Sequence, residues 1–132
     1  MAFITAPRIH DGYNCLPAGT TLQLADDGTI VAILDAAPDG TIHYEGVIAP
    51  AFVNVHCHLE LSHMRGVIPE GTGLMTFLQS VPRYRNAFTE EQKVAARHAA
   101  AAAMWQNGVA AVGDIANTTD TQDVRMAQPG MY

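Results

Sequence analysis

The sequence is poor in basic residues and gathers them nowhere into a run. Seven Lys and Arg stand against thirteen Asp and Glu, which gives a formal net charge of −6. A protein that binds nucleic acid neutralises phosphates with clustered positive charge. Because no such cluster is present, we expect no nucleic-acid partner.

Cysteine and long apolar runs are also scarce. The two cysteines, Cys15 and Cys57, are too few and too far apart for a disulfide framework, which favours a reducing, cytoplasmic location. No stretch approaches the roughly eighteen uninterrupted apolar residues of a membrane span, and residues 1–8 lack the basic start and apolar core of a signal peptide. We therefore expect no membrane association. A hydrophobic content of 48% indicates a folded domain.

Three turn signals punctuate the first 46 residues: Asp11-Gly12, Asp26-Asp27-Gly28 and Pro38-Asp39-Gly40. Between them lie short β-prone runs such as 20–24 and 29–34. Asp-Gly suits hairpins because glycine reaches positive φ without a Cβ penalty. This pattern predicts a small antiparallel sheet over residues 1–46.

The character of the chain changes at Val47. Residues 47–55 are almost continuously apolar, which predicts a strand buried on both faces, as in parallel sheets. Residues 74–81 then have helical character up to Pro82, where we expect that helix to end.

The strongest helix signal follows Thr89. Thr89-Glu90-Glu91-Gln92 has the form of a capping box, and an alanine-rich run extends to Asn107 before Gly108, so a helix is predicted over 90–107. Its packed face is predicted from residues three and four apart: Val94, His98, Ala101, Ala102 and Trp105.

A second buried strand is predicted over 109–115, and no clear element follows it. Strand, helix and strand form a βαβ unit, whose strands run parallel. One such unit cannot cover both faces of its own sheet. We therefore expect residues 1–46 and 47–132 to be the front part of a longer α/β protein.

The most informative motif is His56-Cys57-His58, at the end of the first buried strand. In a strand, side chains repeat every second residue, so both imidazoles point one way and Cys57 points the other. Two neutral imidazoles can bind one Zn²⁺, which takes four ligands in structural sites and three protein ligands in catalytic ones. The pair is therefore half a site, and Cys57 is expected to be a packing residue.

Residues 48–62, Ile-Ala-Pro-Ala-Phe-Val-Asn-Val-His-Cys-His-Leu-Glu-Leu-Ser, resemble the first barrel strand of the amidohydrolase superfamily. The likeness is to its cytosine deaminase-like and chlorohydrolase-like branch, and most narrowly to aminodeoxyfutalosine deaminase-like enzymes. It extends through 66–69 and 113–115. One departure is Ala51, where relatives usually carry glycine after the proline.

The resemblance implies the N-terminal fragment of a (β/α)₈ barrel preceded by part of a small β-sandwich. It implies a metal-dependent hydrolase that deaminates a heterocyclic or nucleoside-like small molecule with a metal-activated water. His56 and His58 would hold Zn²⁺, with Fe²⁺ as the alternative. The remaining ligands and the acid–base residues would lie beyond Tyr132, since a complete barrel needs roughly 250 residues. Homo-oligomerisation is left open.

Four further residues are candidates for substrate binding: Glu60, His63, Arg83 and Arg85. Glu60 could meet substrate or orient a ligand imidazole if the strand continues, and an ordinary loop carboxylate is the alternative. His63 is expected to face solvent unless it contacts substrate. The two arginines could meet an anionic group or form a solvated patch. A glutamate common in nucleoside deaminases of this branch is not evident here, which weakens the case for an adenosine-like substrate.

Two alternatives remain open at this level. Asp114, at the end of the second strand, could orient a metal ligand or support a loop. The chain as a whole could instead be a non-catalytic, β-rich module that binds metal or another protein. In that case the free edge of the second strand would need to be covered by another chain.

Overall fold

The computed structural model describes residues 1–128 and 130–131 of the chain, and it divides into two compact units, 1–50 and 51–132. Each unit is described by itself. Among the residues that the structure describes, no helix has both the length and the apolar character needed to cross a bilayer.

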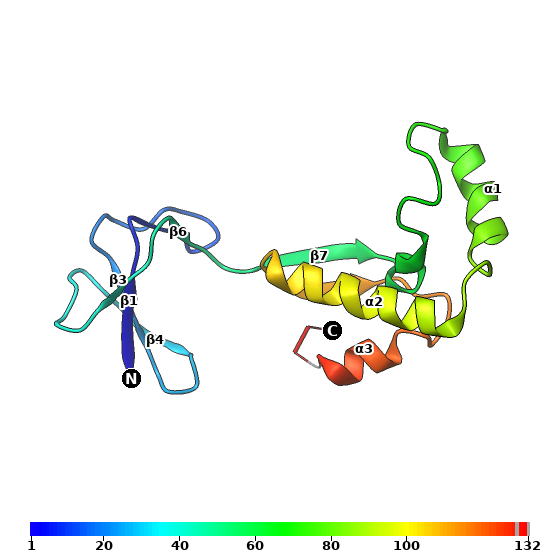
Figure 1. Ribbon diagram of the computed structural model, residues 1–132. Coiled ribbons are helices and arrows are strands. Elements are labelled where there is room, and N and C mark those ends of the chain that lie inside the picture. Colours follow the sequence, from blue (N-terminus) through cyan, green and yellow to red (C-terminus); the bar gives the residue numbers. More distant parts are fainter. Residues whose placement is uncertain (129, 132) are drawn as a thin grey trace. The chain divides into compact units, whose positions relative to one another are not determined.

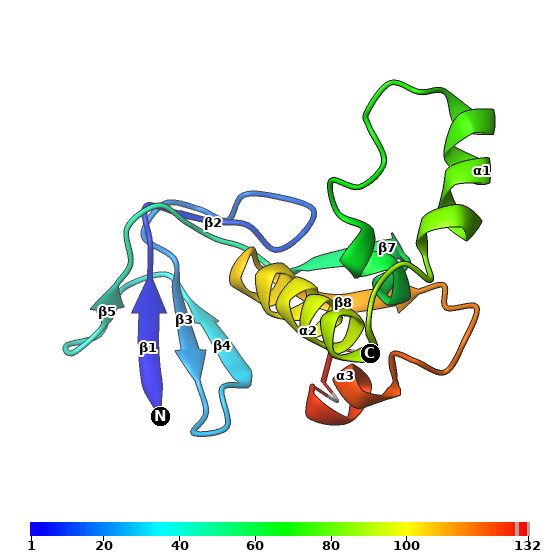
Figure 2. The same ribbon diagram turned by 45° about the vertical axis from the view of Figure 1, so that its right-hand side comes forward.

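The first unit contains a four-stranded sheet in the order β4-β3-β1-β5 (Figure 2). Its strands are β1 (Ala2–Thr5), β3 (Thr21–Leu24), β4 (Ile30–Leu34) and β5 (Ile42–His43). β3 pairs antiparallel with both β1 and β4, which confirms the predicted antiparallel sheet, whereas β5 pairs parallel with β1. Gly28, at φ +86°, occupies the left-handed region in the turn between β3 and β4, as the Asp-Gly signal predicted.

The strand predicted over 47–55 is in fact two strands in different units. Val47–Ile48 forms β6, which pairs parallel with β2 (Arg8–Ile9) in the first unit, whereas β7 begins only at Phe52. Pro50 lies in the break and has no N–H to donate to a strand ladder. The prediction of one continuous strand was therefore wrong, because the proline between β6 and β7 interrupts the hydrogen-bond ladder.

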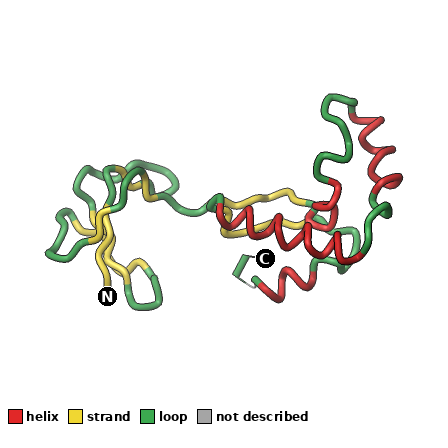
Figure 3. Tube along the Cα trace, in the orientation of Figure 1, coloured by secondary structure: helices red, strands yellow, loops and turns green. Residues whose placement is uncertain are grey.

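The second unit alternates strands and helices (Figure 3). It consists of β7 (Phe52–Cys57), the 3₁₀-helix η1 (Leu59–Met64), α1 (Leu74–Tyr84), α2 (Glu90–Gln106), β8 (Val109–Asp114) and α3 (Gln122–Ala127). β7 and β8 pair in parallel, and α2 runs alongside them (Figure 1). The predicted βαβ connection is therefore present.

The capping box at the start of α2 is formed as predicted. The Thr89 backbone N–H donates to Gln92 Oε1 at 2.9 Å, and the Gln92 N–H donates to Thr89 Oγ1 at 3.3 Å. The predicted packed face is largely confirmed: Ala101 is buried, and Val94, His98 and Ala102 are partly buried. Trp105 is the exception at 62% exposed, and Arg97 is buried although it was not predicted. An alanine-rich helix has little contrast between its faces, so periodicity does not define the edges of the packed face sharply.

Two further expectations about helices were wrong. Pro82 lies inside α1, which continues to Tyr84, and the Arg85 N–H donates to Val81 O. Proline removes one helical hydrogen bond, but the bonds of the residues that follow it are enough to extend the helix by a few residues. No element was predicted after β8, yet α3 forms there and buries Val124 completely.

The core of the second unit lies on one side of the β7–β8 pair. Its buried centre is formed by Leu59, Ala101 and Val124, with Cys57, Ala100 and Met104 packed against it. The other side is open, since Val53 and Val55 are 60% and 78% exposed. The expectation that residues 47–55 are buried on both faces is therefore wrong for this chain, because helices cover only one face of the strand pair.

An ion-pair cluster connects α2 to α3. Arg97 Nε donates to both carboxylate oxygens of Asp123 at 3.0 and 3.1 Å, and His98 Nε2 lies 3.0 Å from Asp123 Oδ2. Burial raises the pKa of Asp123, but the bonds from Arg97, the Val124 N–H and His98 outweigh it and lower the pKa below its ordinary value. The cluster thus favours the ionised carboxylate in the folded state.

Replacing Asp123 with Asn should make the stability of the chain less sensitive to acid. Because the folded pKa lies below the ordinary value of 3.8, the charged carboxylate stabilises the fold above that pH and loses this effect as the pH falls through the folded pKa. The stability advantage of wild type over the variant should be constant above about pH 5 and shrink below it. Urea unfolding from pH 7 to pH 2 measures this advantage, with the exposed Asp120→Asn as control.

Gly113 allows the backbones of β7 and β8 to approach closely. A Cβ at this position would lie 2.9 Å from Val55 O and 3.2 Å from Val55 C. Gly113→Ala should therefore destabilise the chain by about 1–3 kcal/mol, because a backbone atom in a paired strand cannot move aside. Urea unfolding measures the cost, and Ala111→Gly serves as the control for glycine content in the same strand. An alanine variant as stable as wild type would contradict this close approach.

Candidate metal-binding site

The imidazoles of His56 and His58 converge beyond the carboxyl end of β7. Their Nε2 atoms lie 3.2 Å apart, their ring centroids lie 5.2 Å apart, and the rings are inclined by 64°. Two nitrogens bound to one tetrahedral Zn²⁺ at its usual bond length lie about 3.3 Å apart. The spacing therefore fits two ligands of a single metal ion.

The proton position on His58 follows from its other ring nitrogen. His58 Nδ1 lies 2.8 Å from the carbonyl oxygen of Ile115. A carbonyl can only accept, so in this contact Nδ1 carries the proton and Nε2 of the neutral ring keeps its lone pair. Metal-ligating histidines commonly donate their second nitrogen in this way. His58 thus presents the lone pair of Nε2 toward His56.

Two links hold the carboxyl ends of β7 and β8 together. The Ile115 N–H donates to Cys57 O at 2.7 Å, and the Leu59 N–H donates to Asp114 Oδ1 at 2.9 Å. The second link joins a side chain at the end of β8 to the backbone just after His58. Of the two roles predicted for Asp114, the structure shows loop support, and the ring nitrogen contacts of His56 and His58 are to each other and to Ile115.

Glu60 is buried, with only 1% of its side chain exposed. Its carboxylate accepts hydrogen bonds from Asn117 and Thr118, at the start of the loop after β8. Burial raises its pKa, but these bonds and the Arg85 charge outweigh it and leave the pKa below its ordinary value. Because β7 ends at Cys57 and η1 follows, the side-chain alternation that would have aligned Glu60 with the histidines does not apply.

The other substrate-binding candidates lie in different surroundings. His63 is partly buried: its Nε2 lies 3.1 Å from Arg85 O, and its ring packs edge-on against Phe88. Arg85 lies 3.8 Å from Glu60 Oε1, whereas Arg83 is exposed and lies over the Tyr84 ring. The structure thus brings Glu60 and Arg85 together, and it places Arg83 outside that cluster.

Cys57 is a packing residue, as the sequence predicted. Its side chain packs against the buried core formed by Leu59, Ala101 and Val124. Burial raises the pKa of the thiol, and the nearby Asp114 charge raises it further. Both effects favour the neutral thiol, which suits a packing residue better than a ligand or a nucleophile.

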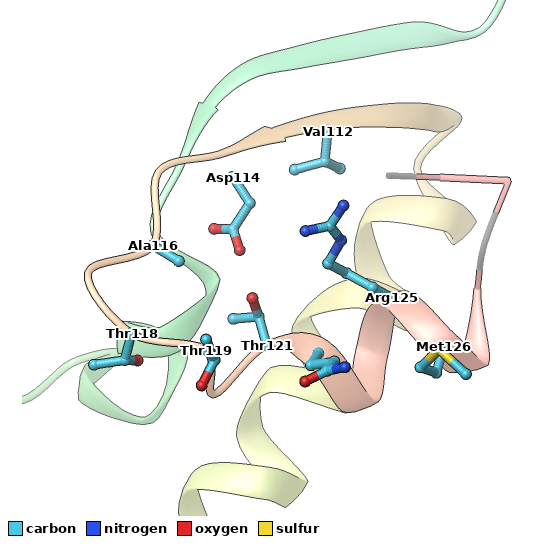
Figure 4. A pocket seen from close by; sticks show the side chains of 9 residues that line it. Val112, Asp114, Ala116, Thr118, Thr119, Thr121, Arg125 and Met126 are labelled. Carbon is cyan, nitrogen blue, oxygen red and sulfur yellow. The ribbon is translucent and has the colours of Figure 1, made fainter.

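A cleft of about 750 Å³ lies between β8 and α3 (Figure 4). Asp114, Thr118, Thr121 and Arg125 are among the polar residues that line it. Asp114 Oδ2 is buried and has no hydrogen-bond partner within the described part of the chain. The cleft thus brings a carboxylate, hydroxyls and a guanidinium to the side of β8.

The histidine pair stands without further ligands in the described part of the chain. Over residues 1–128 and 130–131, no group of three or more His, Cys, Asp or Glu side chains is arranged to hold a metal ion. The donor set of two imidazoles fits zinc or iron(II) in chemistry and in spacing, and it supplies half of a four-ligand shell.

Comparison with known proteins links this geometry to a class of fold. No protein-family model and no curated protein matches the chain. Among solved structures, aminofutalosine deaminase from Helicobacter pylori in complex with methylthio-coformycin is similar with a TM-score of 0.77 and 23% identity, over 98% of this chain and 33% of that one. An amidohydrolase from Brucella melitensis is similar with a TM-score of 0.67 and 20% identity, over 88% of this chain and 27% of that one.

The chain therefore has the fold of part of an amidohydrolase, and the resemblance inferred from His56-Cys57-His58 is confirmed at the level of the fold. It is a mixed α/β fold. The chain spans about a third of the length of these solved structures.

Sequence reasoning missed the partners of the site in the loop after β8. Ile115 supplies a carbonyl to His58, and Asn117 and Thr118 bind Glu60. A signal for them was present, because polar residues that directly follow a second parallel strand meet the end of the first strand at the same sheet edge. The residue types alone do not predict which backbone groups in this loop bind His58 and Glu60.

Removing the Asp114 carboxylate should cost stability through the backbone beside His58. Leu59 is 1% exposed, so without Asp114 Oδ1 its N–H would be left without an acceptor. Asp114→Ala should destabilise the chain by about 1–3 kcal/mol, whereas Asp114→Asn keeps an acceptor oxygen and should cost less. Urea unfolding of both variants tests this, and equal costs would show that the hydrogen bond is not the reason.

Proposed function

We propose that the chain is the N-terminal part of a metal-dependent hydrolase that cleaves a C–N bond and deaminates a heterocyclic or nucleoside-like small molecule. One observation carries the proposal: two imidazole Nε2 atoms lie 3.2 Å apart at the carboxyl end of a parallel strand, and one ring is fixed through Nδ1. Active sites of parallel α/β folds lie at this end of the strands.

His56 and His58 would hold the metal through Nε2. A bound divalent ion would lower the pKa of a coordinated water and so supply a nucleophile near neutral pH. The chain's own contribution is orientation: the Ile115 carbonyl holds the His58 ring with its lone pair toward His56. The chemical nature of the ligands favours zinc, with iron(II) as the alternative.

Two features support the assignment of residues 51–132 to the first β/α units of a barrel. β7, α2 and β8 form a parallel βαβ unit, whose open face exposes Val53 and Val55. In a closed barrel, such side chains are buried in layers within the interior. The chain also covers 33% of the aminofutalosine deaminase. The first unit would then contribute to a small β-sandwich.

We propose deamination, and not another reaction that cleaves a C–N bond, because one of the similar solved structures is a deaminase. That protein is named an aminofutalosine deaminase, and its structure was solved with methylthio-coformycin. The remaining metal ligands and the groups that transfer protons would come from later strands of the complete polypeptide. For the 132-residue chain we therefore expect weak metal binding and no turnover.

Zinc titration of the isotopically labelled chain tests the half-site. The ring resonances of His56 and His58 should shift together, with weak affinity because only two protein ligands are present. His56→Ala should abolish the response of His58, whereas His43→Ala, an exposed histidine of the other unit, should leave it unchanged. The proposed metal site would be contradicted if only the resonances of other histidines shifted, or if no histidine resonance shifted at millimolar zinc.

Ammonia release separates the enzyme from a non-catalytic module. The polypeptide that contains this chain together with the remaining barrel should release ammonia from a panel of heterocyclic amines. Chelation or His58→Ala should abolish that activity by removing the metal. If the purified 132-residue chain deaminated the panel efficiently, the proposal that later strands complete the site would be wrong.

A further inference from the structure

The Glu60 carboxylate accepts four hydrogen bonds from the loop that follows β8. Oε2 accepts from the Asn117 N–H at 2.8 Å, the Thr118 N–H at 3.3 Å and the Thr118 hydroxyl at 3.3 Å, and Oε1 accepts from Asn117 Nδ2 at 2.8 Å. Arg85 lies 3.8 Å from Oε1. We call Glu60, Asn117 and Thr118 the loop clamp.

The loop clamp holds a short segment whose first residue is Ile115. The Ile115 N–H is bound to Cys57 O at 2.7 Å, and two residues later the backbone is bound to Glu60. The Ile115 carbonyl therefore lies between two fixed points. It is the group that accepts from His58 Nδ1 at 2.8 Å.

The position of that carbonyl decides which nitrogen of His58 is available. With the carbonyl in place, the proton stays on Nδ1 and the lone pair is on Nε2, toward His56. If the segment moves, the neutral ring can place its proton on Nε2. Nε2 then cannot bind a metal without losing that proton.

A neutral side chain replaces the carboxylate of this clamp only in part. Glu60 meets four donors with two acceptor oxygens, and ionised carboxylates offer about four lone-pair sites. A glutamine has one acceptor oxygen and would turn its amide hydrogens toward Asn117 Nδ2, which is itself a donor. The isosteric change therefore removes one acceptor oxygen and sets two donors against each other unless the Asn117 amide turns over.

We propose that Glu60 is a positioning residue for the metal ligand His58: through Asn117 and Thr118 it fixes the Ile115 carbonyl, which holds His58 in the tautomer that binds metal. Glu60 itself contacts neither histidine nor metal. The proposal deepens the proposed function and rests on it, because the tautomer matters to the reaction only if His58 is a ligand.

The experiment compares four variants of the 132-residue chain. Glu60→Gln breaks the clamp. The double variant Glu60→Gln/Asn117→Asp restores it with exchanged polarity: the amide oxygen introduced at position 60 would take the place of Oε2, and its NH₂ group would donate to the carboxylate introduced at position 117. Asn117→Ala removes one of the four bonds and is a milder change in case Glu60→Gln fails to fold. Glu70→Gln, in an exposed loop, is the matched control.

Two readouts are taken on each folded variant. Long-range ¹H–¹⁵N spectra report which ring nitrogen of His58 carries the proton. Zinc titrations followed on the His56 and His58 rings give the apparent affinity. We expect Glu60→Gln to lose the Nδ1–H tautomer and about tenfold or more in zinc affinity, as loss of a group that orients a ligand does. Asn117→Ala should move both readouts less, and the double variant should recover both.

The outcomes separate this proposal from the proposed function. An unchanged His58 tautomer in both folded clamp variants would overturn the positioning role, even if they unfold more easily. The positioning role would also be overturned if the His58 tautomer shifted in Glu60→Gln but did not return to the wild-type form in the double variant. If the tautomer shifts and recovers as expected while wild type binds no zinc, the coupling stands and the metal-dependent function fails.

Discussion

The structure of the site depends on hydrogen bonding that continues past the last residues of two short parallel strands. A strand end leaves backbone groups without ladder partners, and buried groups of this kind must be satisfied. Here Ile115 bonds to Cys57 through the backbone, Asp114 takes the Leu59 N–H, and Glu60 takes the N–H groups of Asn117 and Thr118. The same bonds that complete the fold place a carbonyl beside His58.

The core and the site share one short stretch of chain, residues 57–60. Cys57 and Leu59 face the packed side, where Leu59 is 1% exposed, whereas His56, near the end of β7, and His58, just after it, are exposed. Packing on one side thus limits how the histidines can move on the other. Glu60 extends this constraint to the loop after β8, so the two loops are bound to each other as well as to the core.

How much could be predicted from the sequence depended on whether the signal was local. The Thr89 capping box, the Asp-Gly hairpin and the position of β8 follow from neighbouring residues, and all three are present. Trp105 was placed on the wrong face because an alanine-rich helix defines its packed side only through its neighbours. The roles of Glu60 and the Ile115 carbonyl depend on contacts across more than fifty positions, which no local pattern encodes.

The geometry of the histidine pair also requires that the two facing nitrogens differ in protonation. Since His58 Nδ1 donates to Ile115, His58 Nε2 is an acceptor in the neutral ring, and His56 Nε2 at 3.2 Å can donate to it. In that arrangement the Nε2–H of His56 points at the lone pair of His58 Nε2. Two lone pairs facing each other without it would repel, so the arrangement needs either a proton or a cation between the rings. Under the proposed function, a metal ion bound between the rings would have to displace that proton.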